Sequence, residues 1–151
     1  MKLVVLCVAI LFWGTPLFSA EPAPEEDYQL LEGKWVRNDQ DAKGAPLRVE
    51  HEISQKISKL SVYDKSGKLV HAHQAKFRLQ RMSDANLFTY FDLEVLNGPN
   101  KGRQQKTPQS FVYRVKDGQF IQVEGILNND KMPLKLLVWW KANPPVSAQD
   151  I

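Results

Sequence analysis

Cysteine is almost absent from this sequence of 151 residues, and the only one, Cys7, lies in an apolar run near the N-terminus. The run spans residues 3–13, begins after Met1-Lys2 and is followed by small residues that end at Ala20. A positive start, a short apolar stretch and small residues before a polar chain indicate a secretory signal peptide. The run is shorter than the roughly 20 apolar residues of a membrane span. We therefore predict a signal peptide over residues 1–20, cut after Ala20, with a cut at Ser19 as the alternative.

Removal of this segment leaves a chain without any cysteine. Disulfides, thiolate catalysis and cysteine-based zinc sites are then excluded, and an exported domain of this kind depends on its apolar core. The sequence also lacks an Asn-x-Ser/Thr glycosylation motif. These absences favour a bacterial protein that is periplasmic or extracellular.

The chain has no excess of one charge in any one place. It contains 20 Lys and Arg against 17 Asp and Glu, and the two signs are interspersed. Nucleic-acid binders usually carry a clustered basic stripe, so nucleic acid is not an expected partner. The mature chain is also expected to contain no membrane span.

Motifs of known enzymes are missing as well. There is no Gly-x-Ser-x-Gly elbow, and the glycine-containing loop over residues 97–108 lacks the P-loop pattern. Asp92 and Glu94 share a strand face, as a catalytic carboxylate pair would, but acids on a solvated outer face explain them equally well. We predict that the protein is not an enzyme and that it needs no cofactor.

Long helices are missing too, and most of the chain shows the apolar alternation of strands. Residues 21–26 form a Pro-rich acidic stretch that we predict to be a flexible tether. A short helix is expected over residues 27–33, with Asp27 as N-cap and Gly33 as stop. Eight strands are expected over residues 34–39, 47–53, 59–63, 69–81, 87–96, 110–116, 119–126 and 134–141.

Eight sequential strands with short connections predict an all-β fold, an eight-stranded antiparallel up-and-down barrel with a short N-terminal helix. The barrel domain is expected over residues 27–143, and residues 144–151 are expected to be a loose tail. Asp117-Gly118 predicts a two-residue hairpin turn. That turn pairs Lys116 with Gln119 and Tyr113 with Gln122.

Neither face of this hairpin is cleanly apolar. One face combines aromatic and polar side chains: Phe111, Tyr113, Val115, Phe120, Gln122 and Glu124. A barrel interior of this mixed character is what a ligand cavity needs. The alternative is a core filled by its own side chains, which is common in small barrels.

The segment Gly33-Lys34-Trp35 stands at the start of the first expected strand, directly after the short helix. This Gly-x-Trp motif resembles the lipocalin (calycin) signature. The resemblance implies that Gly33 and Trp35 close one end of the barrel. It also implies a basic residue stacked on the Trp, for which Lys141 and Arg114 are the candidates.

A closer resemblance is to an uncharacterised family of small, secreted, lipocalin-like bacterial domains. The matching segments are residues 31–35, 43–47, 91–93, 97–102 and 113–118. They cover most of the mature chain, although Trp139-Trp140 and a long apolar strand replace the family's usual short ending. The resemblance implies a fold and export, and it implies no activity because the family has no established catalytic residues.

These observations predict an exported, non-catalytic binding protein that holds a small apolar or amphipathic ligand in its barrel. The expected ligand-binding residues are Phe91, Leu93, Tyr113, Phe120 and Gln122, with Trp35 closing the floor. The alternative is a protein-interaction module with a filled core, such as an inhibitor of a secreted hydrolase. Its partner would be an envelope or secreted protein.

Two further residue pairs, His71 with His73 and Trp139 with Trp140, are candidates for a functional role. His71 and His73 lie one strand repeat apart on one face and can chelate a metal, with His51 as the obvious third ligand. Because the site is underspecified, two half-exposed strand histidines are expected and no metal is predicted.

Trp139 and Trp140 must face opposite ways in a strand, so one is expected in the core. The other is expected to be exposed or covered by the N-terminal segment.

Overall fold

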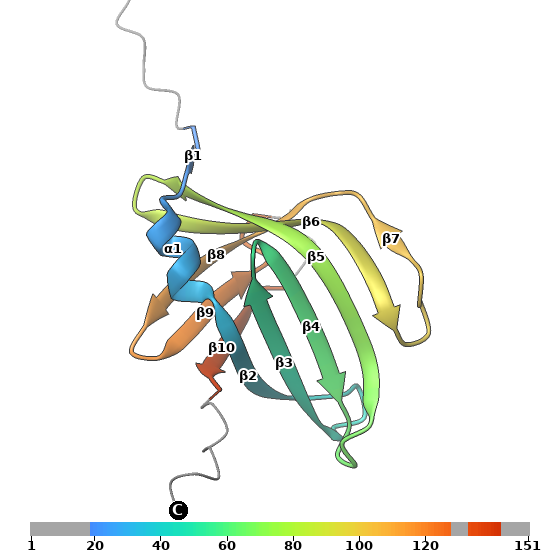
Figure 1. Ribbon diagram of the computed structural model, residues 1–151. Coiled ribbons are helices and arrows are strands. Elements are labelled where there is room, and N and C mark those ends of the chain that lie inside the picture. Colours follow the sequence, from blue (N-terminus) through green and yellow to red (C-terminus); the bar gives the residue numbers. More distant parts are fainter. Residues whose placement is uncertain (1–18, 128–132, 143–151) are drawn as a thin grey trace, which may run out of the picture.

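The structure is a computed structural model that describes residues 19–127 and 133–142 (Figure 1). Most of the expected signal peptide and the whole of the expected tail, residues 144–151, lie outside the described residues. One short helix precedes a series of strands (Figure 1). The elements are β1 (Glu21–Pro22), α1 (Glu25–Leu31), β2 (Gly33–Gln40), β3 (Pro46–Ser54), β4 (Ile57–Tyr63), β5 (Leu69–Met82), β6 (Ala85–Asn97), β7 (Gln104–Gln105), β8 (Gln109–Lys116), β9 (Gln119–Glu124) and β10 (Lys135–Lys141).

Eight of these strands close into an antiparallel barrel, which confirms the predicted fold class. The order around the sheet is β5-β4-β3-β2-β10-β9-β8-β6, and pairing of β6 with β5 completes the circle. Each predicted strand is present within about two residues of its expected bounds. The sequence did not predict β1 and β7, which are two residues long and lie beside β5 and β6.

The hairpin between β8 and β9 has the predicted register. Lys116 pairs with Gln119 and Tyr113 with Gln122. The two turn residues, Asp117 and Gly118, have φ angles of 52° and 73°. Such positive φ values match the right-handed twist of the flanking strands, so the turn itself determines which residues face each other.

The N-terminal segment differs from the prediction. Glu21 and Pro22 pair with β5, so this part of the expected tether is an edge strand. The helix begins after Pro24, and Asp27 is in its first turn instead of at the N-cap. The Asp27 carboxylate binds the Arg81 guanidinium with two hydrogen bonds of 2.8 and 3.0 Å. This two-point ion pair to β5 replaces the expected cap.

The helix is also attached to the barrel by uncharged contacts. The backbone N–H of Leu79 in β5 donates to the Tyr28 hydroxyl at 2.8 Å, and the Ala23 N–H donates to the Leu79 carbonyl at 3.0 Å. The Tyr28 ring lies 5.6 Å from the Phe77 ring. These contacts place α1 across one end of the barrel (Figure 1).

Trp35 is buried at this end and is 1% exposed. Its indole N–H donates to the Leu31 carbonyl at 2.8 Å, and the Lys141 ammonium lies 4.7 Å from its ring centroid. Lys141 also donates to the Glu32 carbonyl at 2.6 Å. Of the two basic candidates, Lys141 is therefore the residue over the indole, whereas Arg114 is exposed on β8.

Aromatic side chains fill the barrel beyond Trp35. The buried rings belong to Trp35, Phe77, Phe88, Phe111, Tyr113, Phe120 and Trp139. Phe77 and Phe88 are stacked, with centroids 4.8 Å apart and an interplanar angle of 6°. Phe120 lies 5.6 Å from Trp35 and 6.1 Å from Phe88. Much of the interior is thus a packed core.

This arrangement predicts a large difference between two tryptophan variants. Trp35→Ala should lower the free energy of unfolding by about 3–5 kcal/mol, because it empties a buried aromatic site. Trp140→Ala should change it by about 0.5 kcal/mol or less, because Trp140 is 53% exposed. Urea unfolding of both variants checks this. Equal effects would contradict the assignment of Trp35 to the core.

Candidate functional site

A small cavity with a mixed polar and apolar lining remains inside the barrel, with a volume of about 100 Å³. Side chains from all eight barrel strands line it: Arg37, His51, Ser58, Leu60, His73, Phe88, Tyr90, Phe111, Gln122, Glu124, Leu137 and Trp139. The mixture of aromatic rings with charged and amide groups is the character that the sequence predicts for the interior.

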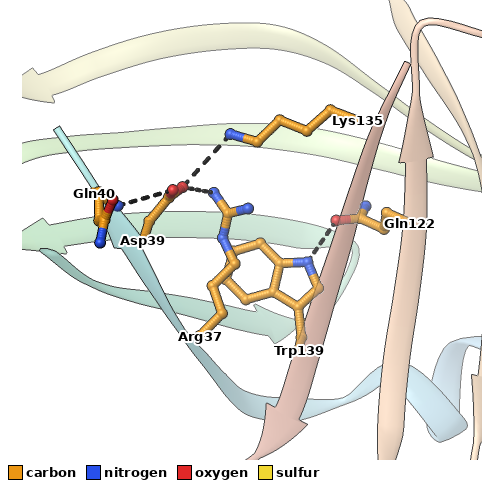
Figure 2. A network of polar contacts seen from close by, with 6 residues as sticks. All are labelled: Arg37, Asp39, Gln40, Gln122, Lys135 and Trp139. Carbon is orange, nitrogen blue, oxygen red and sulfur yellow. Dashed lines mark hydrogen bonds and ion pairs between the residues drawn. The ribbon is translucent and has the colours of Figure 1, made fainter. Parts of the chain in front are cut away.

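The cavity lies beside the join between β2 and β10. These strands pair only through Trp140 with Val36 and Lys141 with Trp35. Beyond these pairs the two strands diverge, and side chains bridge the gap (Figure 2). We call this unpaired stretch, between residues 37–40 of β2 and residues 135–139 of β10, the seam.

An ion cluster crosses the seam. The Asp39 carboxylate lies 3.1 Å from the Arg37 guanidinium and 3.6 Å from the Lys135 ammonium (Figure 2). It also accepts the Gln40 backbone N–H at 3.0 Å. Burial opposes ionisation of Asp39, but this hydrogen bond and the two cations outweigh burial and lower the pKa of its carboxyl.

Arg37 connects the ion cluster with the cavity. Its guanidinium lies 4.5 Å from the Trp139 ring centroid, and the Trp139 indole N–H donates to the Gln122 side-chain oxygen at 2.9 Å (Figure 2). Burial lowers the pKa of Arg37, and the charges of Asp39 and Glu124 oppose that effect. The Nε atom of Arg37 is buried and has no hydrogen-bond partner among the described residues.

His51 forms another part of the wall. Its Nε2 lies 2.7 Å from the Ser58 hydroxyl, and its ring centroid is 5.1 Å from that of Trp139. Burial, together with the charges of His73 and Arg37, lowers the pKa of His51 to about 3. The ring is therefore neutral at neutral pH. Its Nδ1 is buried and has no partner within the described part of the chain.

The contact between Ser58 and His51 has the composition of a nucleophile and its base, but its environment does not suit catalysis. A general base works best when its pKa is close to the working pH, and that of His51 is far below it. In a Ser-His-Asp triad, a third group also orients the histidine. Among the described residues, no group bonds His51 Nδ1.

The other two histidines also meet on the inner face. His71 Nε2 lies 3.0 Å from His73 Nδ1, and His73 faces Leu60 of β4, which in turn faces His51 of β3. Burial, and then the charge of His71, lowers the pKa of His73 to about 4. Within residues 19–127 and 133–142, no group of three or more His, Cys, Asp or Glu side chains is placed to hold a metal ion.

The predicted ligand-binding residues are not together in the structure. Gln122 lines the cavity, whereas Tyr113 and Phe120 belong to the packed core. Leu93 is half-buried and is not part of the cavity lining. Phe91 lies near the Arg78 guanidinium, 6.0 Å from it, on the outward row of β5 and β6.

The expectation that Phe91 faces the cavity was therefore wrong, because the two-residue repeat alone does not say which face of a strand is inward. On β6, Phe88 and Tyr90 point inward, and Tyr90 stacks on Phe111 at 5.3 Å. A bulge then follows, with Asp92 at a φ of 52°. Phe91 thus points outward by simple alternation with Tyr90. The bulge inserts one residue and changes the faces only of the residues that follow it.

Sequence reasoning missed Arg37 and Tyr90 as cavity residues and treated His51 only as a metal ligand. A signal was present for Arg37, because it alternates with Trp35 and Asp39 along one strand face. His51 similarly alternates with Val49 and Ile53, which are both buried. A charged residue that alternates with buried residues along a strand indicates that the barrel interior contains polar groups.

Comparison of this chain with known protein families, with curated proteins and with solved structures finds no match. The class of the protein is therefore defined by its own geometry, as a closed eight-stranded antiparallel barrel with a lipocalin-like plan and one short helix. In the described part of the chain, no helix has the length and apolar character needed to cross a membrane.

The buried histidines predict that stability depends on pH. His51 and His73 have pKa values of about 3 and about 4 when folded, against 6.5 as the ordinary value. As the pH falls below about 6.5, the unfolded chain binds protons that the folded chain does not, so the free energy of unfolding decreases. Each ring contributes a slope of up to about 1.4 kcal/mol per pH unit.

Urea unfolding between about pH 7 and pH 5 measures this slope, in a range where most carboxylates stay ionised. The variant His51→Gln should have a shallower slope than the unmodified protein. Arg78→Gln, at an exposed position on β5, serves as the control and should keep the full slope. An unchanged slope in His51→Gln would contradict a buried, neutral His51.

Proposed function

We propose that this protein is an exported, non-catalytic binding protein whose barrel takes one small polar ligand into the cavity beside the seam. One observation carries the proposal: Arg37 Nε and His51 Nδ1 are buried without hydrogen-bond partners, and both residues line this cavity. A buried polar atom without a partner costs about 1–3 kcal/mol. A ligand that bonds both atoms recovers that free energy.

The cavity volume limits the size of the ligand. An apolar cavity of roughly 150 Å³ in another protein holds one benzene molecule. A cavity of about 100 Å³ therefore suits a molecule smaller than benzene. This ligand is smaller and more polar than the apolar or amphipathic molecule that the sequence predicts.

The lining also indicates the charge of the ligand. Arg37 supplies a positive charge, and Asp39 and Glu124 supply negative charge close to it. Arg37 Nε and the Gln122 amide nitrogen are donors, whereas the Glu124 carboxylate is an acceptor. A neutral molecule with both donor and acceptor groups fits these surroundings best.

Support for a binding role without catalysis comes from His51. Its low pKa makes it a weak base, and its contact with Ser58 lacks an orienting group among the described residues. Export is supported by the pattern of residues 1–20 alone.

Native mass spectrometry of protein purified from an exporting host tests this function. A light adduct, lost on denaturation, is expected on the unmodified protein. Arg37→Met should abolish the adduct because it removes the unpartnered donor. The matched control Arg78→Met, at an exposed arginine on β5, should retain it. An adduct of lipid size, or a light adduct that survives in Arg37→Met, would contradict the proposal.

A second candidate function is protein interaction through the outer surface. Leu134, Leu136 and Trp140, in and next to β10, are 70%, 64% and 53% exposed. Adjacent exposed apolar side chains are typical of interaction surfaces. This function needs no cavity ligand, so a bare native mass together with a stable complex with a secreted hydrolase would favour it.

A further inference from the structure

The outer side of the seam forms a second, separate groove. It has a volume of about 330 Å³ and lies on the opposite side of the sheet from the cavity. The lining residues are Val36, Arg37, Asn38, Arg48, Val138 and Trp140. The Arg37 guanidinium itself lies on the cavity side, over Trp139.

The end of pairing between β2 and β10 explains why a groove exists there. Ala142 N–H donates to the Lys34 carbonyl at 2.8 Å, so even-numbered residues of β2 direct their backbone polar groups toward β10. The ladder stops after Val36 and Trp140. Asn38 and Val138 would form the next hydrogen-bonded pair in this register, and both line the groove.

Trp140 supplies a flat apolar surface at one side of this groove. It is 53% exposed, whereas its neighbour Trp139 is 1% exposed on the inner face. Pairing with both Val36 and Gln119 holds the Trp140 backbone rigidly in the sheet. An exposed indole on a rigid strand offers a large contact area at a low cost in conformational entropy.

Polar groups stand beside the indole. Asn38 pairs with Arg48 across β2 and β3, so their side chains are neighbours on the outer face. Arg48 is exposed and uses one N–H to bind Glu50 at 2.8 Å. Lys34 binds the same Glu50 carboxylate at 3.1 Å, so this group of three residues carries a net positive charge.

The described lining of the groove contains no carboxylate. The indole face of Trp140 suits a ring that has C–H bonds on one face. The Asn38 amide suits hydroxyls at the edge of that ring, and the free N–H groups of the Arg48 guanidinium suit one negative charge. We propose that this groove binds an acidic sugar, with the sugar ring stacked on Trp140, its carboxylate on Arg48 and a hydroxyl on Asn38. The volume suits one sugar unit at the lower end of ligand-pocket sizes.

Nuclear magnetic resonance titration tests this site with two matched probes, methyl β-glucuronide and methyl β-glucoside. They differ only in a carboxylate against a hydroxymethyl group. The glucuronide should shift the indole N–H signal of Trp140 in a saturable way and leave the signals of buried Trp35 and Trp139 unchanged. It should bind about tenfold more tightly than the glucoside, because it gains a charge-assisted hydrogen bond to Arg48.

Three variants complete the experiment. Trp140→Ala should weaken glucuronide binding about tenfold or more, and Arg48→Gln should remove the preference for the glucuronide. Leu136→Ala is the control, because Leu136 is exposed on the same strand face but does not line the groove. Circular dichroism and unfolding curves establish that each variant folds, as expected for exposed positions.

Several results would overturn the proposal. Absence of a saturable shift with either probe would do so, and equal affinity for the two probes would remove the acidic sugar as the ligand. If no probe binds and a protein partner is lost equally in Trp140→Ala and Leu136→Ala, the outer face of β10 is a protein-docking surface. The cavity variant Arg37→Met and its control Arg78→Met are not involved, so this outcome is independent of the proposed cavity function.

Discussion

Closure of the barrel depends on the join between β2 and β10, the first and the last of its eight strands. Ladder pairing at this join covers only two residue pairs, and one further backbone hydrogen bond joins Ala142 to Lys34. At one end, Lys141 lies over Trp35 and bonds the Glu32 carbonyl. At the other end, Asp39 links Arg37 with Lys135 across the seam. Side chains therefore complete a circle that backbone hydrogen bonds alone leave partly open.

The same constraint accounts for both candidate sites. Arg37 points inward by strand alternation with Trp35, and beside the diverging strands it lies over Trp139 and lines the cavity next to the aromatic core. On the outer side, the divergence leaves a groove between Asn38 and Val138, with Trp140 beside it. Arg37 lines both spaces. A substitution in the seam should therefore alter both the cavity on the inner face and the groove on the outer face.

Gly33 shows how closely the end of the barrel is packed. Its φ of 117° is a conformation that other residues rarely adopt, and a Cβ there would lie 3.3 Å from the Lys141 side chain. The glycine of the Gly-x-Trp segment thus lets the chain turn from α1 into β2 while the lysine reaches the indole. This gives the motif a physical reason that does not depend on any family.

Much of the fold could be predicted because it depends on local patterns. Alternating apolar residues located the eight strands, and the Asp117-Gly118 turn determined the register of β8 and β9. The short β1 was beyond prediction, since two residues that pair at a sheet edge carry no pattern of their own. The site was harder to predict than the fold: only Gln122 of the five expected lining residues faces the cavity.

The sequence by itself determined the class of fold, the order of the strands and the opposite directions of Trp139 and Trp140. These follow from the two-residue repeat of a strand and from turn chemistry. Only the tertiary structure decided which face is inward, that Lys141 and not Arg114 covers Trp35, and that Arg37 and His51 share a cavity. Those outcomes depend on how strands far apart in the chain pack together, and no local pattern encodes that packing.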